Sequence, residues 1–166
     1  VPIAGVRFAP LDVSWFFFSI GLVFWLVLMT IVLYRLFFHE PLPARLTPTL
    51  FILIAPPAVG FLAYVELIDR LDGFARVLYF TALFLTLLLS SRAISFFRLP
   101  FFISAWAYTF PLAALTIATF EMGARSHQAF YTGLGWILLA VVSSAVGLIS
   151  FKTVLASVQG KVFAPE

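Results

Sequence analysis

Phe110 and Pro111 lie in the middle of a long uncharged stretch, where their side chains could serve a function inside a membrane. Residues 99–120 carry no charged side chain, and Pro111 lies near the centre of this stretch. Proline has no backbone N–H, and its ring crowds the carbonyl of the residue four positions earlier, which is Ala107. A carbonyl freed in this way is tolerated at membrane depth only beside other protein or water. The stretch therefore predicts a kinked transmembrane helix in the interior of the protein.

The helical spacing around Phe110 leaves two interpretations open. Ala107, Ala114 and Ala118 continue the face of Phe110, so one large ring projects from a row of small side chains. Small residues let helices approach closely, and spacing alone favours this packing interpretation. The alternative is that the face carrying Phe110 lines a passage through the membrane.

A second uncharged stretch has the same features. Pro56 and Pro57 lie near the middle of the apolar run that begins at Leu46, and Pro56, Gly60 and Ala63 fall on one helical face. We expect a second kinked helix here.

The composition predicts an integral membrane protein. Hydrophobic residues make up 63% of the 166 residues and charged residues 10%, with a mean hydropathy of +1.12, whereas soluble domains carry roughly 25% charged residues. Five apolar stretches account for nearly all of the chain, so the predicted fold is an all-α, polytopic, single transmembrane domain. The predicted spans are residues 13–35, 46–66, 76–97, 99–120 and 128–152. The chain begins in a loop-like segment without an initiator Met, which suggests a piece of a longer polypeptide.

Kinked and straight spans alternate along the chain. The second and fourth spans carry central prolines and small residues, and the first, third and fifth do not. This alternation favours repeated helical hairpins in which one member faces an interior and the other faces lipid. Two kinked helices cannot enclose a conduit, so further inner helices would have to come from elsewhere.

The basic residues predict the orientation. Alternate loops place six of them on one side, namely Arg35, Arg45, Arg92, Arg98, Lys152 and Lys161. The opposite loops mix basic with acidic residues, as in the stretch between Glu66 and Arg76. The positive-inside rule therefore predicts a cytoplasmic C-terminus.

Several kinds of chemistry are missing from the sequence. It has no cysteine, no glycine-rich phosphate loop, no HExxH motif and no serine triad, and His39 and His127 lie in predicted loops. We expect no enzyme activity, no metal site, no cofactor and no nucleic-acid partner. The ionisable residues lie at the span ends, which argues against a proton relay and favours a passive route over a coupled pump.

The stretches PTLFILIAPPAVGFLAY, GFARVLYFTALFL and AWAYTFPLAALTIAT, in this order, resemble the TehA/slow-anion-channel family. The resemblance covers essentially the whole chain and corresponds to the C-terminal half of that fold. It implies a homotrimer of ten-helix proteins, each built from five hairpins around a central pore. It also implies that Phe110, in YTFP, projects into the pore and occludes it, with Pro111, Pro56 and Pro57 at the bends of the inner helices.

The resemblance reverses the preference for packing at Phe110. It implies a passive, phenylalanine-gated channel for small inorganic or organic anions in the lipid bilayer of the bacterial cytoplasmic (inner) membrane. One alternative is a carrier for tellurite or C4-dicarboxylates, the labels such proteins often bear. A structural membrane subunit is the third possibility for a short chain.

Overall fold

Helices and short connections make up the whole of the described chain. The computed structural model describes residues 2–40, 42–91 and 101–159, and within them there is no β-strand. Five helical segments there are long and apolar enough to cross a membrane: Leu11–Phe38, Arg45–Ile68, Gly73–Ser90, Ile103–Ser126 and Ala129–Val158. The predicted all-α polytopic fold with five transmembrane helices is confirmed.

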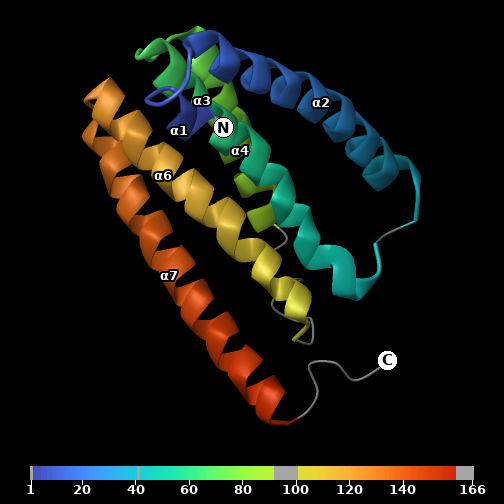
Figure 1. Ribbon diagram of the computed structural model, residues 1–166. Coiled ribbons are helices and arrows are strands. Elements are labelled where there is room, and N and C mark those ends of the chain that lie inside the picture. Colours follow the sequence, from blue (N-terminus) through green and yellow to red (C-terminus); the bar gives the residue numbers. More distant parts are fainter. Residues whose placement is uncertain (1, 41, 92–100, 160–166) are drawn as a thin grey trace.

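The first span, α2 (Leu11–Phe38), contacts the rest of the chain along one narrow face. The short helix α1 (Pro2–Gly5) packs near its beginning. A row at three- and four-residue spacing faces the core, and most of the other side chains of α2 are exposed. This row is Trp15, Phe18, Leu22, Trp25 and Met29. In Figure 1, α2 meets α3 at one end and diverges from it toward the other.

The two proline-containing spans are each built from two kinds of helix. A 3₁₀ segment, η1 (Ala44–Ile54), leads directly into α3 (Ala55–Ile68), and η2 (Ile103–Tyr108) leads directly into α6 (Thr109–Ser126). At each junction an N–H donates to the carbonyl three residues earlier, from Ala55 to Ile52 and from Thr109 to Trp106.

The expectation of an α-helix on both sides of each proline therefore needs correction, because a 3₁₀ segment precedes it. In 3₁₀ pairing a carbonyl accepts from the N–H three residues later rather than four. A carbonyl paired in this way does not need the N–H four residues later, which is the one that a proline at that position lacks. The prolines mark a change of helix type, and each lies in the first turn of an α-helix, where proline is well tolerated.

The other two spans are continuous α-helices, α4 (Gly73–Ser90) and α7 (Ala129–Val158). Asp72 caps α4, because its carboxylate accepts from the backbone N–H of Ala75 at 2.9 Å and from the hydroxyl of Tyr64 at 2.8 Å. The Ala75 N–H bond is the main reason that the pKa of Asp72 lies below its ordinary value. The cap thus fixes the start of α4 against the end of α3.

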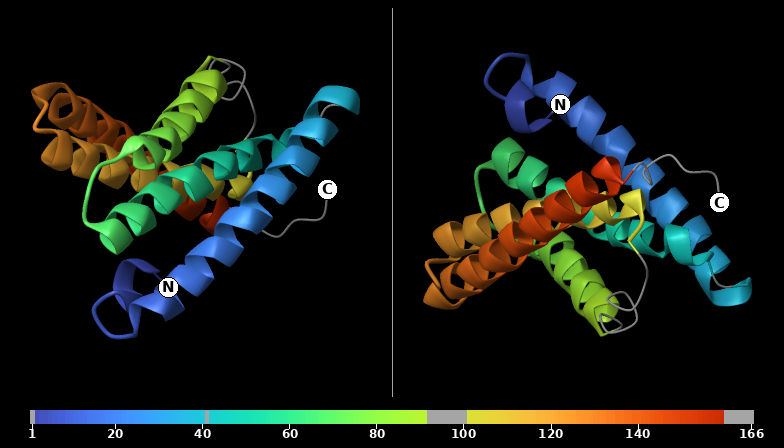
Figure 2. Two further views of the ribbon diagram at one scale, coloured as in Figure 1. Left: turned by 90° about the horizontal axis from the view of Figure 1, so that it is seen from above. Right: turned by 90° about the horizontal axis from the view of Figure 1, so that it is seen from below.

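The proline-containing spans are the most buried. Half of the most apolar stretch of Arg45–Ile68 is buried, against 6% for Leu11–Phe38 and 17% for Ala129–Val158. Figure 2 shows α3 between α2 and α4, and α6 runs beside α7 in both figures. This burial agrees with the expectation that the helices with prolines are the inner members of their hairpins.

The predicted loop between the last two spans is wrong over Glu121–Ser126, which forms the final turns of α6. Glu121 and Arg125 are four residues apart and pair with each other, which stabilises the helix beyond its apolar part. Several predicted features lie outside the described residues, namely the end of the third span at Ala93 to Phe97, the beginning of the fourth at Leu99, and Arg92, Arg98 and Lys161.

Candidate functional site

The two inner spans lie side by side and run in the same direction. η1 packs on η2, and α3 packs on α6. The hydroxyl of Ser104 donates to the carbonyl of Arg45 at 2.6 Å, and the rings of Phe51 and Tyr108 meet edge to face with centroids 4.8 Å apart. The two changes from 3₁₀ to α-helix therefore belong to neighbouring chain segments.

Equivalent positions in these two helices have the same environment. Pro57 is the third residue of α3 and Pro111 the third of α6, and both are fully buried. The residue before each proline is exposed, Pro56 in α3 and Phe110 in α6. The fold thus buries one proline at each junction and exposes the residue before it.

Phe110 is the large apolar side chain exposed at this junction. Its relative exposure is 64%, although α6 is one of the inner helices. A phenylalanine that served packing within the described residues would be covered by them. The ring of Phe110 is therefore available to a space or a partner beyond these helices.

The small residues predicted to share the face of Phe110 are covered to different degrees. Ala114 is 5% exposed and Ala118 is 0% exposed. Ala107 is half-buried, and so is Gly60, which was predicted on the face of Pro56 in the other inner span. Ala114 and Ala118 pack against neighbouring helices here, which fits helix packing better than a role in lining a pore.

Sequence reasoning missed Ile117. This residue follows Phe110 at a spacing of seven, which is two helical turns, and it is 57% exposed. The i+7 spacing is present in the sequence, but the sequence analysis assigned the face of Phe110 from the small alanine residues alone. The exposed face of α6 therefore joins Phe110 to Ile117.

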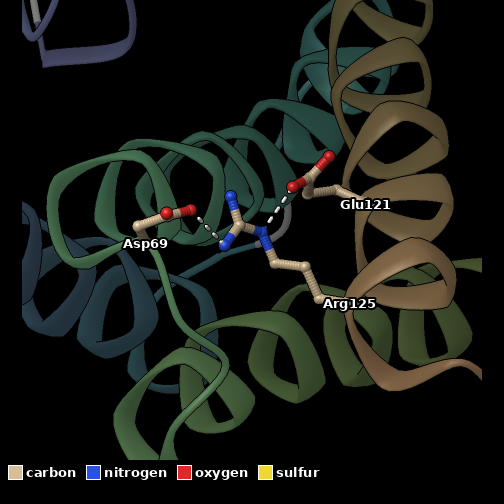
Figure 3. Close-up of polar contacts among 3 residues, drawn as sticks. All are labelled: Asp69, Glu121 and Arg125. Atoms are coloured by element: carbon tan, nitrogen blue, oxygen red, sulfur yellow. Dashed lines mark hydrogen bonds and ion pairs between the residues drawn. The ribbon is translucent and has the colours of Figure 1, made fainter.

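An ion cluster joins the two inner helices at their other end. Arg125 of α6 donates to the carboxylates of Glu121 and of Asp69, the latter at 3.2 Å (Figure 3). Asp69 follows α3 in a left-handed conformation with φ 48°, which turns the chain away from the helix. The guanidinium thus connects the ends of α3 and α6, a contact hidden from the sequence because these residues are far apart in it.

A buried polar contact holds α4 against α6. The hydroxyl of Tyr79 donates to Oγ1 of Thr119 at 3.2 Å, and the Thr119 hydroxyl donates to the carbonyl of Leu115 at 2.8 Å. The Tyr79 ring also lies near Phe61 of α3 and Tyr131 of α7, with centroids 5.6 and 5.7 Å apart. Tyr79 therefore contacts three helices at once and fixes their positions around the inner pair.

The part of the chain that the structure describes contains no candidate metal site. No group of three or more His, Asp or Glu side chains there lies close enough together to hold an ion. What the described site offers is an exposed aromatic ring on a well-packed inner helix. Such a ring can fill or narrow an apolar space.

The sequence of this chain is similar to that of known membrane transport proteins. Residues 2–154 match the family described as SLAC1, voltage-dependent anion channel. The S-type anion channel SLAH2 of Arabidopsis thaliana is 36% identical over 140 residues, and SLAH3 of the same plant is 32% identical over 152 residues. These matches cover 84% and 91% of this chain but only 26% and 23% of the plant proteins.

A relative from an archaeon also matches most of this chain. The uncharacterized transporter MJ0576 of Methanocaldococcus jannaschii is 26% identical over 170 residues, which cover 83% of this chain and 47% of that protein. The chain thus spans less than half the length of each of these three relatives. Since the family match covers most of the 166 residues and includes both inner helices, the chain belongs to the SLAC1/TehA family of anion channels.

Proposed function

We propose that this chain forms part of a passive anion channel and that the ring of Phe110 is its gate. The family match and the plant relatives named as S-type anion channels support an anion as the transported species. The observation that carries the proposal is the 64% exposure of Phe110 on a helix that also carries fully buried large side chains, such as Leu115 and Met122.

The gating mechanism follows from the chemistry of the ring. Water in a narrow space beside an apolar ring finds no hydrogen-bond partner there, and a hydrophobic constriction can stop ions by dewetting. No charge is needed for such a barrier. Rotation of the ring, or a small movement of α6, would open the passage without breaking a strong interaction.

In this proposal the chain supplies two of the inner walls of the pore. A closed pore needs protein on every side, because backbone and water cannot face lipid. We propose that further helices complete a ten-helix pore of five hairpins, and that three such proteins form a homotrimer. The two neighbouring units, each with a junction from 3₁₀ to α-helix, support a pore built from repeats.

The test is anion flux through the full-length protein in liposomes. Chloride and nitrate should move down their gradients without a proton gradient, and Phe110→Ala should increase the flux. Phe24→Ala is the matched control, because Phe24 on α2 has a similar exposure of 61% and lies outside the junction. Saturating transport that required a proton gradient would instead support the carrier for tellurite or C4-dicarboxylates.

The proposed location is the bacterial inner membrane, with the C-terminus in the cytoplasm. Lys152 near the end of α7 and Ala124 near the end of α6 lie at opposite ends of the hairpin these helices form. A cysteine at position 124 should react with an impermeant thiol reagent from outside the cell, and one at position 152 only after the membrane is opened. Equal labelling of both positions in intact cells would refute this orientation.

A further inference from the structure

The outer face of α4 carries an open apolar groove with a cation at one end. The groove has a volume of about 410 Å³ and is lined by Arg76, Val77, Phe80, Thr81 and Phe84. The hydroxyl of Thr81 donates to the carbonyl of Val77 at 2.8 Å, so its polar group is already satisfied by the helix. The part of the groove from Val77 to Phe84 is therefore apolar and suited to a hydrocarbon chain.

The face opposite the groove is the one that packs on the protein. Leu78, Tyr79 and Ala82 are buried against the neighbouring helices. The groove residues lie on the other side of α4, and Val77, Phe80 and Phe84 are exposed. Figure 2 shows α4 at the edge of the bundle, with α3 between it and α2.

Arg76 lies at the depth expected for the membrane surface. It is in the first turns of α4, just after the charged turn of Asp69 to Asp72. Phe84 is eight residues further along the helix, which corresponds to about 12 Å at 1.5 Å per residue. A headgroup at Arg76 and an acyl chain along the groove would match this spacing.

The acidic residues nearest in sequence have other partners. Asp72 accepts from the Ala75 N–H and the Tyr64 hydroxyl, and Asp69 pairs with Arg125. Within the part of the chain that the structure describes, Arg76 forms no ion pair or side-chain hydrogen bond, and its side chain is exposed.

We infer that the outer face of α4 binds an acidic phospholipid, with the phosphate on Arg76 and an acyl chain along Val77, Phe80 and Phe84. The positive charge of Arg76 at the end of the groove favours an acidic lipid over a protein segment as the occupant. A protein segment that covered an apolar face would leave the guanidinium without a partner, whereas an acidic lipid matches both the cation and the hydrocarbon surface below it.

The first test measures lipid retention. The full-length protein is extracted from vesicles of phosphatidylcholine and phosphatidylglycerol, and bound lipids are counted by native mass spectrometry. Arg76→Gln should weaken phosphatidylglycerol binding about fivefold, the ratio that corresponds to roughly 1 kcal/mol per basic residue near a membrane surface. Arg70→Gln is the matched control, since Arg70 lies in the preceding turn and does not line the groove. Equal phosphatidylglycerol retention by the two variants would overturn the inference.

The second test identifies what contacts the groove. A photoreactive benzoylphenylalanine at position 84 should form an adduct with the mass of a phospholipid when the protein is illuminated in the same vesicles. The adduct should contain phosphatidylglycerol more often than its share of the vesicle lipid, and Arg76→Gln should remove this excess. A crosslink to protein, whether a second copy or another part of the same chain, would show that the groove is an interface and overturn the inference.

Discussion

Two segments of this protein have the same construction and differ in one exposed side chain. The segment from η1 to α4 and the segment from η2 to α7 each contain a 3₁₀ helix, an α-helix with a buried proline in its first turn, and a straight α-helix. The residue before the buried proline is Pro56 in the first segment and Phe110 in the second. The shared parts explain how the chain packs, so the difference is where a specific function is expected.

The segments differ also in how closely their two α-helices approach. A methyl group added at Gly135 of α7 would lie 2.8 Å from two ring carbons of Phe120 in α6, whereas one at Gly60 of α3 would lie 3.8 Å from Leu78 of α4. The hairpin that carries Phe110 is therefore the more tightly packed. The gate proposed at Phe110 would benefit from such a support, because the ring could move while the helix stays in place.

The largest effect is expected at the shared core. Phe61 is the seventh residue of α3 and Leu115 the seventh of α6, and both are fully buried. Phe61→Ala should lower the free energy of unfolding by about 3–5 kcal/mol, and Leu115→Ala by about 2–5 kcal/mol. Unfolding in mixed micelles would measure both. Similar losses of stability would indicate that the two segments have equivalent cores. A loss at only one position would show that the cores differ.

The next effect concerns the residue in which the segments differ. Phe110→Ala should raise anion conductance about tenfold, which corresponds to a barrier lower by about 1.4 kcal/mol. Phe110→Leu should give a smaller rise because it retains much of the bulk, and Pro56→Ala a smaller one still because proline is already short. Single-channel recording of the full-length protein would rank the three variants.

The same variants separate gating from packing. Since Phe110 is exposed, its replacement by alanine should cost less stability than Phe61→Ala. A Phe110→Ala protein that folds poorly but conducts like the wild type would identify Phe110 as a packing residue and remove the gate assignment.

A smaller effect should distinguish the two hairpins. Gly135→Ala requires the Phe120 ring to shift, and overpacking of this kind costs about 1–3 kcal/mol, partly offset by the higher helix propensity of alanine. Gly60→Ala meets only ordinary contacts and should be neutral or stabilising by up to about 1 kcal/mol. Thermal unfolding of both variants provides the comparison. The same change in melting temperature for both would mean that the hairpins are equally packed.

The smallest effect is a pH dependence specific to the first segment. The pKa of Asp72 is lowered by its bond from the Ala75 N–H, so the folded state favours the ionised carboxylate. Its stabilising contribution is therefore complete above the ordinary pKa of about 3.8 and is lost as the pH falls through the lower folded value. Asp72→Asn, which retains a capping side chain but does not titrate, should remove this component of acid destabilisation. Unchanged acid unfolding in the variant would exclude Asp72 as its source.

Much of the fold could be predicted from the sequence because the membrane restricts the solutions. Twenty apolar residues must form a helix when the backbone has no water to bond to, so composition and run length predict five spans. Pro56, Pro57 and Pro111 also lie in the two most buried spans, as expected if a proline within a span requires a neighbouring chain.

Local physical chemistry in the sequence determined the apolar helices and the positions of the prolines within them. The tertiary structure alone decided that the prolines follow 3₁₀ segments, that Ala114 and Ala118 are buried while Ile117 is exposed, and that Arg125 joins Asp69 to Glu121. The reason is that a helical periodicity gives the angular positions of side chains but not the side on which the neighbouring helix lies. That side is set by contacts between residues far apart in the chain, such as Tyr79 with Thr119, which no local pattern contains.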